Sequence, residues 1–309
     1  MRSPESFFAG NRFGGVKSVE PISTGLSGAG VYAVTTDAGE FFLRLSAQGQ
    51  EGFDEMLATL NLAAREGIAP KVVFADDNAG AVVTEKVIGI PIGAALAQPG
   101  VRQHVLRSVA ETLGSLHAIP APHLPVMEPS LGQSIWDQQS RRDGFPTWAK
   151  PSGACVMSGG TALAKDQRRV FSHNDANPAN LIWDGSRVWM VDWERAALAH
   201  PYIDLATFSV FAVLPDEDAL GLLSVQERSP ILVEQREMFL LLLNYVRAIY
   251  GAVFLRLIPD LTVVEFAERE KTPTLPECYG LIGKGSLELR TPAGQALLGA
   301  AILRQVDQA

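Results

Sequence analysis

The sequence predicts an α+β fold in two parts, a small antiparallel β-sheet with one helix followed by a larger, mainly helical region. Short β-rich runs fill the chain from about residue 13 to residue 87, and helical periodicity prevails after residue 89. The chain has 309 residues, which is more than one small core accommodates. We therefore expect an N-terminal domain at residues 1–88 and a C-terminal domain at residues 89–309.

The N-terminal domain combines four β-rich runs with one helix. The runs lie at residues 31–35, 40–45, 71–75 and 81–87. Asp37-Ala38-Gly39 joins the first two runs and is typical of a hairpin turn. Residues 53–65 place apolar side chains at helical spacing, and Gly67 ends this helix. These elements predict an antiparallel sheet with one packed helix.

The C-terminal domain is expected to be mostly helical. Apolar residues fall on one face of a helix at 105–116, which stops before Pro120. Residues 120–160 are rich in Pro, Gly and polar residues, which predicts an irregular segment that either forms a lid or packs onto this domain. The most hydrophobic stretch, residues 238–258, is interrupted by Asn, Gly and Arg, so we expect a buried helix and no membrane span.

The composition narrows the function classes. A net charge of -8 and a pI near 5.2 argue against a nucleic-acid partner, which usually meets a basic face. Two cysteines are too few for a disulfide framework, and the N-terminus lacks the apolar segment of a signal peptide. We expect a cytoplasmic protein that acts on a small molecule, and no feature fixes an oligomeric state.

The residues that carry chemistry lie between residues 171 and 194. Asp175 and Asn180 form D-x-x-x-x-N, which is the spacing of a kinase catalytic loop, and Asp192 follows where a second metal-binding acid belongs. Two β-rich runs flank the turn sequence 184–187, and the mean position of Asn180 and Asp192 is residue 186. A hairpin about that point would bring Asn180 opposite Asp192 to within a residue or two.

Phosphoryl transfer needs side chains of these types. Asp175 would orient or deprotonate the attacking hydroxyl, while the oxygen atoms of Asn180 and Asp192 would hold Mg²⁺ against the phosphates of ATP. Glu194 shares a strand face with Asp192 and would assist the metal or a cationic substrate. His173 would brace the loop. A lone Asp or Asn in a loop is usually a turn former, but three at the required spacings favour the phosphotransfer interpretation.

These residues resemble the aminoglycoside phosphotransferase and choline kinase superfamily. His173-Asn174-Asp175 through Asn180 and the Asp192-Trp193-Glu194 triplet resemble its choline/ethanolamine kinase-like branch. The resemblance covers roughly residues 13–260 and implies a protein kinase-like bilobal fold. It also implies that Asp204, at the start of a later helix, braces the catalytic loop by hydrogen bonds, although a helix cap is the simpler role for such a residue.

The resemblance also implies a nucleotide site in the N-terminal domain. Residues 24–32 form a glycine-rich turn whose backbone amides could approach phosphates, although a plain glycine hairpin has the same sequence features. Its candidate phosphate-binding residues are Gly25, Ser27, Gly28 and Gly30. Arg44 lies in the next strand, where a guanidinium would bind phosphate oxygens, and Glu55 is its expected partner, with Glu51 and Asp54 as alternatives.

Residues 84–87 resemble the hinge between kinase lobes. There the backbone of Glu85 and Val87 would bind adenine, and a simple edge strand is the alternative.

The substrate is expected beside Asp175. Candidate contacts are aromatic or acidic side chains: Trp193, Glu194, Trp136, Tyr245 and Tyr250. An aromatic box closed by Glu194 would suit a choline-like amino alcohol, narrowly preferred over thiamine, an aminoglycoside or another alcohol. Aromatic residues at helical spacing are more often core.

Two other function classes remain open. A pseudokinase-like module would keep the fold and bind nucleotide without transfer. A metal-dependent hydrolase could use His173, Asp175, Asp192 and His200, but no HxxxH or HxH pair supports it.

Overall fold

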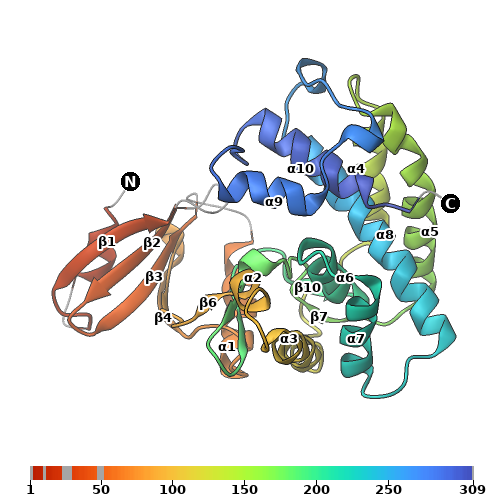
Figure 1. The fold of residues 1–309 in the computed structure, drawn as a ribbon. Helices are drawn as coiled ribbons and strands as arrows, with labels where there is room; N and C mark the ends of the chain where they lie inside the picture. The colour runs from red at the N-terminus through yellow and green to blue at the C-terminus, as the bar shows by residue number, and fades with distance from the viewer. Residues whose placement is uncertain (1–2, 10–11, 23–29, 47–51, 308–309) are drawn as a thin grey trace. The chain divides into compact units, whose positions relative to one another are not determined.

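The computed structural model describes residues 3–9, 12–22, 30–46 and 52–307 (Figure 1). Contacts divide the chain into two compact units. Unit 1 comprises Met1–Leu116 and Pro178–Ala196, and unit 2 comprises His117–Asn177 and Ala197–Ala309. Each unit is described in turn.

Unit 1 is built on a five-stranded antiparallel sheet with the order β1-β2-β3-β5-β4. The strands are β1 (Val16–Ile22), β2 (Gly30–Thr36), β3 (Gly39–Leu45), β4 (Val72–Asp76) and β5 (Ala81–Glu85). The predicted hairpin is confirmed, since Thr36 pairs with Gly39 across Asp37-Ala38. The four expected runs are therefore strands, and β1 adds a fifth that the sequence did not single out.

A cluster of aromatic rings closes one face of this sheet. The short 3-10 helix η1 (Pro4–Phe8) buries Phe8, whose ring lies 4.9 Å from that of Phe13. The Phe13 ring in turn meets Phe41 of β3 edge-on at 5.1 Å. Burial of these rings and of the aliphatic side chains beneath them supplies most of the free energy that holds the sheet together.

The expected helix is α1 (Phe53–Arg65), which buries Phe53, Met56 and Leu60 at intervals of three and four residues. Gly67 follows with a φ of +71°, a left-handed conformation that glycine adopts without steric cost and that commonly ends helices. The sequence prediction for this element is confirmed.

The remainder of unit 1 comes from two distant stretches of chain. Strand β6 (Ile90–Pro91) pairs with β8 (Leu181–Trp183), which pairs with β9 (Val188–Met190). The first stretch continues with α2 (Ile92–Leu96) and α3 (Arg102–His117), and the 3-10 helix η4 (Pro178–Asn180) precedes β8.

These pairings explain why the contacts do not divide the chain at residue 88, where the sequence analysis placed the boundary. A Cβ atom on Gly89 would lie 2.5 Å from the Trp183 carbonyl oxygen, so the chain crosses residue 88 tightly packed on the β8–β9 hairpin. The hairpin and residues 89–116 therefore belong to the compact unit that contains the N-terminal sheet.

Unit 2 is mainly helical. Its helices are α4 (Ser130–Ser140), α5 (Gly153–Lys165), α6 (Tyr202–Phe211), α7 (Asp216–Glu227), α8 (Val233–Arg256), α9 (Leu275–Gly283) and α10 (Pro292–Arg304). The short strands β7 (Val170–Ser172) and β10 (Ala197–Ala199) form an antiparallel pair. Three 3-10 helices complete the unit: η3 (Thr147–Ser152), η5 (Leu261–Val263) and η6 (Arg269–Lys271).

Helix α8 is the centre of unit 2 and packs against α4, α5, α6 and α10 (Figure 1). Glycines let these helices approach closely. A Cβ on Gly159 of α5 would lie 2.6 Å from the Tyr245 ring, and one on Gly251 would lie 2.5 Å from Leu303 of α10. Among the described residues, α8 is the one helix long and apolar enough to cross a membrane, and more than half of its apolar stretch is buried by these neighbours.

Residues 120–160 are more regular than the sequence predicted. Instead of an irregular segment they form α4, η3 and the first half of α5. Their glycines give low intrinsic helix propensity, but Gly132 and Gly159 both face Tyr245, so packing against α8 favours the helical conformation here. Of the two alternatives, packing onto the domain is the one observed.

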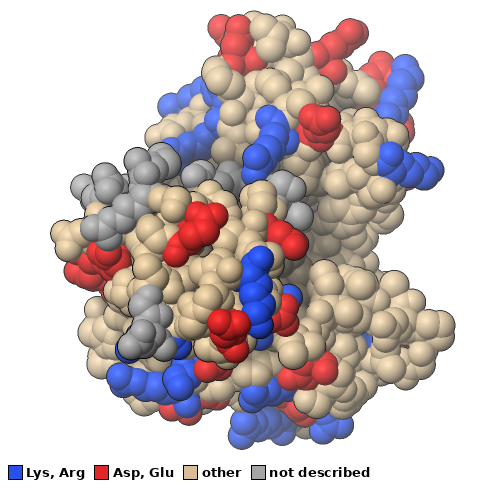
Figure 2. Space-filling view, turned by 90° about the vertical axis from the view of Figure 1, so that its left-hand side faces the viewer, with Lys and Arg blue, Asp and Glu red and all other residues tan. Residues whose placement is uncertain are grey.

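Acidic and basic side chains are interspersed on the surface that Figure 2 shows. Exposed pairs such as Lys86–Glu40 and Lys17–Asp37, with N–O distances of 2.8 Å and 3.0 Å, offset one another on the N-terminal sheet. Such exposed pairs contribute little to stability.

Candidate active site

The β8–β9 hairpin of unit 1 has the predicted register. Leu181 pairs with Met190, and the Val191 N–H donates to the Asn180 carbonyl oxygen at 3.0 Å. Asn180 is thus opposite Val191 and one residue from Asp192. The hairpin prediction is confirmed, and the amide and the acid lie at the same open end of the hairpin.

Asp192 has an unusual backbone conformation for a non-glycine residue. Its φ is +66°, in the left-handed region. This costs roughly 1 kcal/mol for most residues and less for Asp and Asn, and such residues gather at functional sites. The Oδ1 atom of Asp192 is buried and makes no hydrogen bond to the described residues.

Arg44 of β3 provides the positive charge beside this hairpin end. Its guanidinium forms an ion pair with the Glu194 carboxylate and lies 4.0 Å from Asp192 Oδ1. It also donates to the Ser46 hydroxyl at 3.1 Å. Burial lowers the pKa of Arg44, and the neighbouring Asp192 charge opposes that shift.

The expected partner of Arg44 was Glu55, and this expectation is corrected. Glu55 is exposed on α1, whereas the carboxylates that follow β9 reach the guanidinium directly. The side chain of Arg44 is only 17% exposed, so it requires an acidic neighbour in the unit's interior. Asp54 is also exposed on α1, and Glu51 lies outside the described residues.

The donor set at this hairpin end fits Mg²⁺. Asn180, Asp192 and Glu194 offer oxygen atoms, which Mg²⁺ prefers, and the buried Asp192 Oδ1 makes no hydrogen bond to the described residues. Among the described residues no group of three or more His, Cys, Asp or Glu side chains is arranged to hold a metal. Mg²⁺ is usually bound by one or two carboxylates together with phosphate oxygens and water, so two carboxylates and an amide would suffice on the protein side.

In unit 2, Asp204 organises the loop that contains Asp175. The Asp204 carboxylate is fully buried in the first turn of α6 and accepts hydrogen bonds from the backbone N–H groups of His173 and Asn174, at 2.9 Å and 2.7 Å. His117 Nε2 lies 3.0 Å from the same carboxylate. Asp204 thus makes hydrogen bonds to the loop of the kind that the resemblance implies.

Opposing influences set the ionisation of Asp204. Burial is the largest and acts to raise its pKa, but the His117 hydrogen bond and charge, together with the His173 side-chain charge and backbone N–H, outweigh it. The pKa of Asp204 therefore lies below its usual range. Asn174 has a φ of +58°, so the braced loop also includes a left-handed residue.

Asp175 follows directly. Its Oδ1 accepts a hydrogen bond from the Asn177 amide at 2.9 Å, and the Tyr250 hydroxyl of α8 lies 3.4 Å from the same oxygen. His173 is fully buried with its backbone bonded to Asp204, which agrees with a bracing role.

His200 belongs to a separate network in unit 2. Its Nε2 lies 3.2 Å from Asp166 Oδ2 and 3.2 Å from the Arg168 guanidinium. Burial chiefly lowers the pKa of His200 to about 4. The geometry thus commits His200 to Asp166 and Arg168, which disfavours the hydrolase alternative.

Three of the candidate substrate residues are core residues. Trp136 is 5% exposed and meets Phe145 edge-on, and Tyr245 is enclosed between α4, α5 and α8. Trp193 is 2% exposed, and its indole N–H donates to the Met190 carbonyl oxygen. Because hydrophobic packing occupies these rings, they do not line a substrate site. Tyr250 is the aromatic candidate that lies beside Asp175.

Of the candidate nucleotide-binding residues, Gly25, Ser27 and Gly28 lie outside the described residues, and Gly30 begins β2. The Glu85 N–H donates to the Lys71 carbonyl oxygen at 2.9 Å, so this N–H is already bonded within unit 1. Val87 follows β5 in a half-buried, irregular segment.

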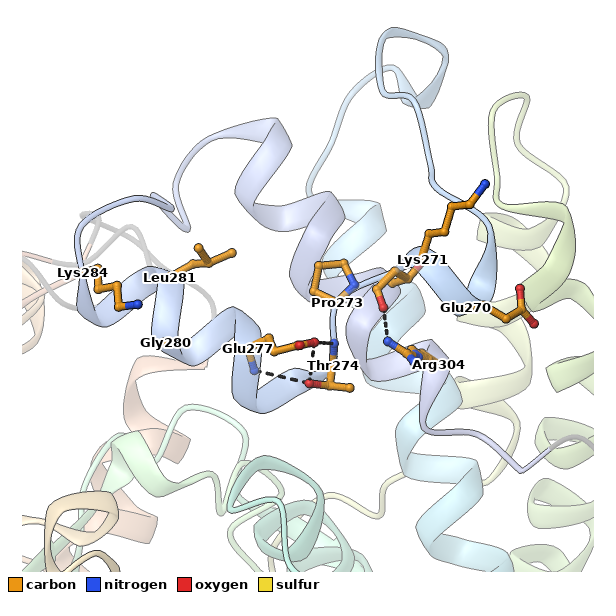
Figure 3. Close-up of a pocket in the computed structure, with 10 residues that line it drawn as sticks. Glu270, Lys271, Pro273, Thr274, Glu277, Gly280, Leu281, Lys284 and Arg304 are labelled. Atoms are coloured by element: carbon orange, nitrogen blue, oxygen red, sulfur yellow. Dashed lines mark hydrogen bonds between the residues drawn. The ribbon is translucent and has the colours of Figure 1, made fainter.

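A surface cavity of about 600 Å³ lies elsewhere in unit 2, between η6, α9 and the end of α10 (Figure 3). Thr274 and Glu277 cap α9 reciprocally at its edge, and Arg304 donates to the Thr272 carbonyl. None of the candidate site residues lines this cavity.

Sequence reasoning missed His117 and Asn177. His117 is the last residue of α3, and the only sequence signal was a basic residue in the final helical turn, which says nothing of a partner 87 residues away. Asn177 lies within the D-x-x-x-x-N motif itself, at a position that the motif leaves open.

Comparison with known proteins places this geometry in a family. A family model described as the phosphotransferase enzyme family matches residues 18–228. A curated N-acetylmuramate/N-acetylglucosamine kinase from Caulobacter vibrioides is 30% identical over 186 residues, which cover 53% of this chain and 50% of that protein. The chain thus matches about half the length of this relative.

Solved structures share the fold. A choline/ethanolamine kinase family protein from Mesorhizobium loti aligns with a TM-score of 0.66 at 17% identity, over 93% of each chain. The choline kinase LicA of Streptococcus pneumoniae, in complex with AMP, aligns with a TM-score of 0.60 at 19% identity, over 80% of this chain and 85% of that one. The predicted kinase-like bilobal α+β class and the superfamily resemblance are confirmed.

Proposed function

Since the chain belongs to the phosphotransferase enzyme family, we propose that it transfers the γ-phosphoryl group of ATP to a hydroxyl of a small molecule. The observation that carries this proposal is the open end of the β8–β9 hairpin. There Asn180 and Asp192 lie on neighbouring positions, and the carboxylates of Asp192 and Glu194 converge on one cation, Arg44. Carboxylate and amide oxygens are the donor types that a Mg²⁺-nucleotide site requires, and an arginine beside them suits the phosphates.

Each residue has a role in the proposed reaction. Asp175 accepts the proton of the substrate hydroxyl while the hydroxyl oxygen forms a bond to the γ-phosphorus of ATP. The bond between the γ-phosphorus and the β–γ bridging oxygen breaks, and ADP leaves. Asp204 holds the Asp175 loop through the backbone of residues 173 and 174. Bound Mg²⁺ would supply charge neutralisation at the phosphates, held by Asn180, Asp192 and Glu194.

The nucleotide is proposed to bind to the N-terminal sheet. The AMP-bound choline kinase of the same fold supports a nucleotide site in this chain. The turn at residues 24–30 would meet the phosphates, and the backbone of Glu85 and Val87 would meet the base. Arg44 would then serve both the acidic pair and the phosphates, because a guanidinium carries five N–H donors.

Two acceptor classes are considered. A choline-like amino alcohol was favoured by an aromatic box, but Trp136, Trp193 and Tyr245 are buried in the core. The curated relative is named as a kinase of N-acetylated amino sugars, and it is the most specific pointer to an acceptor. We therefore place a sugar hydroxyl ahead of choline, ethanolamine, thiamine and aminoglycosides. We also propose a cytoplasmic location, since ATP and such acceptors are found there.

A panel of acceptors tests the proposal. The purified protein is incubated with Mg²⁺ and ATP and with N-acetylglucosamine, N-acetylmuramate, choline, ethanolamine, thiamine or kanamycin, and ADP release is measured. Product formation is checked by ³¹P NMR, and Asp175→Asn is the control. We expect acceptor-dependent ADP release by the wild type alone. ATP binding without turnover on any acceptor would favour a pseudokinase-like module.

A further inference from the structure

Tyr250 of the central helix α8 makes polar contacts with the loop of Asp175. Its hydroxyl lies 3.4 Å from Asp175 Oδ1 and 3.3 Å from the Asn174 carbonyl oxygen. Its ring meets Phe211 of α6 edge-on at 4.8 Å, an arrangement that holds aromatic rings in place. The hydroxyl is thus presented to the loop by the central helix of unit 2.

The Tyr250 phenol remains protonated. Burial is the main cause that raises its pKa well above 10, and the Asp175 charge raises it further. A phenol has one proton to donate, and an ionised carboxylate is a stronger acceptor than a neutral carbonyl. With Asp175 ionised, the proton of Tyr250 is therefore directed at Asp175 Oδ1 rather than at the Asn174 carbonyl.

Two donors consequently converge on one oxygen of Asp175. The Asn177 amide reaches Oδ1 from within the loop, and Tyr250 reaches it from α8. A carboxylate on a loop otherwise turns freely about its terminal bond, since that torsion has broad minima. A pair of donors on Oδ1 restricts the rotation of the Asp175 carboxylate about that bond.

We propose that Tyr250 is a positioning residue that orients the Asp175 carboxylate toward the substrate hydroxyl through its contact with Oδ1. This inference rests on the proposed phosphotransfer function, and it changes the role of Tyr250 from a substrate contact to a support of the catalytic aspartate. Through this contact the core helix α8 would support the catalytic loop.

The variant Tyr250→Phe tests the proposal, because it removes the hydroxyl and keeps the ring against Phe211. Tyr245→Phe is the matched control, since Tyr245 is on the same helix, is buried in the core, and has its pKa raised to about 12 by burial alone. We expect kcat to fall roughly tenfold in Tyr250→Phe with the acceptor KM changed less than about twofold. Tyr245→Phe should keep kcat.

The pH dependence of kcat separates positioning from a merely structural role. Asn177 of the loop and Tyr250 of α8 contact Asp175 Oδ1, and the charges of Asp175 and of Asp204 on α6 both act on the Tyr250 phenol. A donor to the charged carboxylate lowers the pKa of Asp175, so its removal raises that pKa. The acidic limb of the kcat profile should therefore move to higher pH in Tyr250→Phe and stay in place in Tyr245→Phe.

A measurement without turnover distinguishes failure of this inference from failure of the proposed function. The protein is labelled with [¹³C]aspartate, and the Asp175 carboxyl resonance is identified by its loss in Asp175→Asn. Its midpoint of titration should rise in Tyr250→Phe only, whether or not an acceptor is known. An unchanged Asp175 titration, or wild-type kcat with an unmoved acidic limb in Tyr250→Phe, would overturn the inference.

Discussion

At the scale of single residues, the ion pair between Arg44 and Glu194 shows how much a site depends on partners that the sequence does not reveal. The strand of Arg44 was evident from its β-rich pattern, but its partner follows β9 and lies 150 residues further along the chain. Local spacing favoured Glu55 because a following helix usually packs on the strand. The choice between two acidic neighbours depends on tertiary approach, and no sequence period encodes that approach.

A double-mutant cycle measures this pair. Arg44→Met and Glu194→Gln, made singly and together, should show a stabilising coupling of about 1–2 kcal/mol in urea unfolding. The value is kept modest because both side chains retain some exposure, at 17% and 25%. Lys86 and Glu40 are the control pair, as they lie on the same sheet but are more exposed, and we expect their coupling to be near zero to 1 kcal/mol. Equal coupling in the two cycles would refute a special role for Arg44.

At the scale of elements, the motif residues were predictable and their supports were not. The D-x-x-x-x-N spacing and the turn at 184–187 specify the hairpin end, because strand pairing about a short turn fixes register. The contact of His117 with Asp204 joins the end of α3 to the start of α6, and no local pattern predicts it. Likewise Tyr245 and Tyr250 lie five residues apart on α8, and only the packing of that helix decides which of them faces the loop.

The buried Asp204 should make stability depend on pH in a defined direction. Because the folded-state pKa of Asp204 is depressed, its ionisation stabilises the fold above its unfolded pKa of about 3.9. That stability is lost as the pH falls below about 4, through the folded pKa. Asp204→Asn should therefore unfold more easily at pH 7 than the wild type and show a weaker loss of stability from pH 4 to pH 2.

Urea unfolding at pH 7, 4, 3 and 2 checks this expectation. Removing one partner from a buried hydrogen-bonded pair typically costs about 3–5 kcal/mol, which sets the expected loss at pH 7. Asp143→Asn is the control, because Asp143 is exposed in the same unit. A pH profile of Asp204→Asn parallel to that of the wild type would contradict the assignment.

The close approach of α5 to α8 gives a second prediction at this scale. Gly159→Ala would place a methyl group 2.6 Å from the Tyr245 ring, so we expect a loss of about 1–3 kcal/mol in the free energy of unfolding. Gly221→Ala on α7 is the matched change, since nothing lies within 4 Å of its new methyl group. There the higher helix propensity of alanine should stabilise the protein by up to about 1 kcal/mol. Urea unfolding of both variants would show the opposite signs.

At the scale of the whole molecule, the predicted α+β kinase-like fold class was right. The predicted domain boundary at residue 88 differs from the division into two compact units that the contacts produce. Composition and periodicity predict a β-rich part and a helical part, because each pattern reflects local burial. They do not predict that the β8–β9 hairpin, from the middle of the chain, joins the compact unit of the N-terminal sheet. That grouping arises from the pairing of Ile90 with Trp183, a contact between residues 93 positions apart.

Asp175, Asn180 and Asp192 are proposed to act together in one phosphotransfer reaction. When residues act as a unit, the fold-losses in kcat of the single variants do not multiply in the double variant. Asp192→Asn suits this test, because asparagine tolerates the left-handed φ of +66° at that position better than alanine. Asp175→Asn is a suitable second variant, because asparagine has nearly the same shape as aspartate.

The most direct measurement is the rate of acceptor-dependent ADP release by the wild type, Asp175→Asn, Asp192→Asn and the double variant, with melting temperatures to confirm folding. We predict that each single variant loses roughly 10²–10⁴-fold in kcat and that the double variant is about as slow as the slower single one. Near-wild-type turnover by either single variant, or losses that multiply in the double variant, would contradict the account.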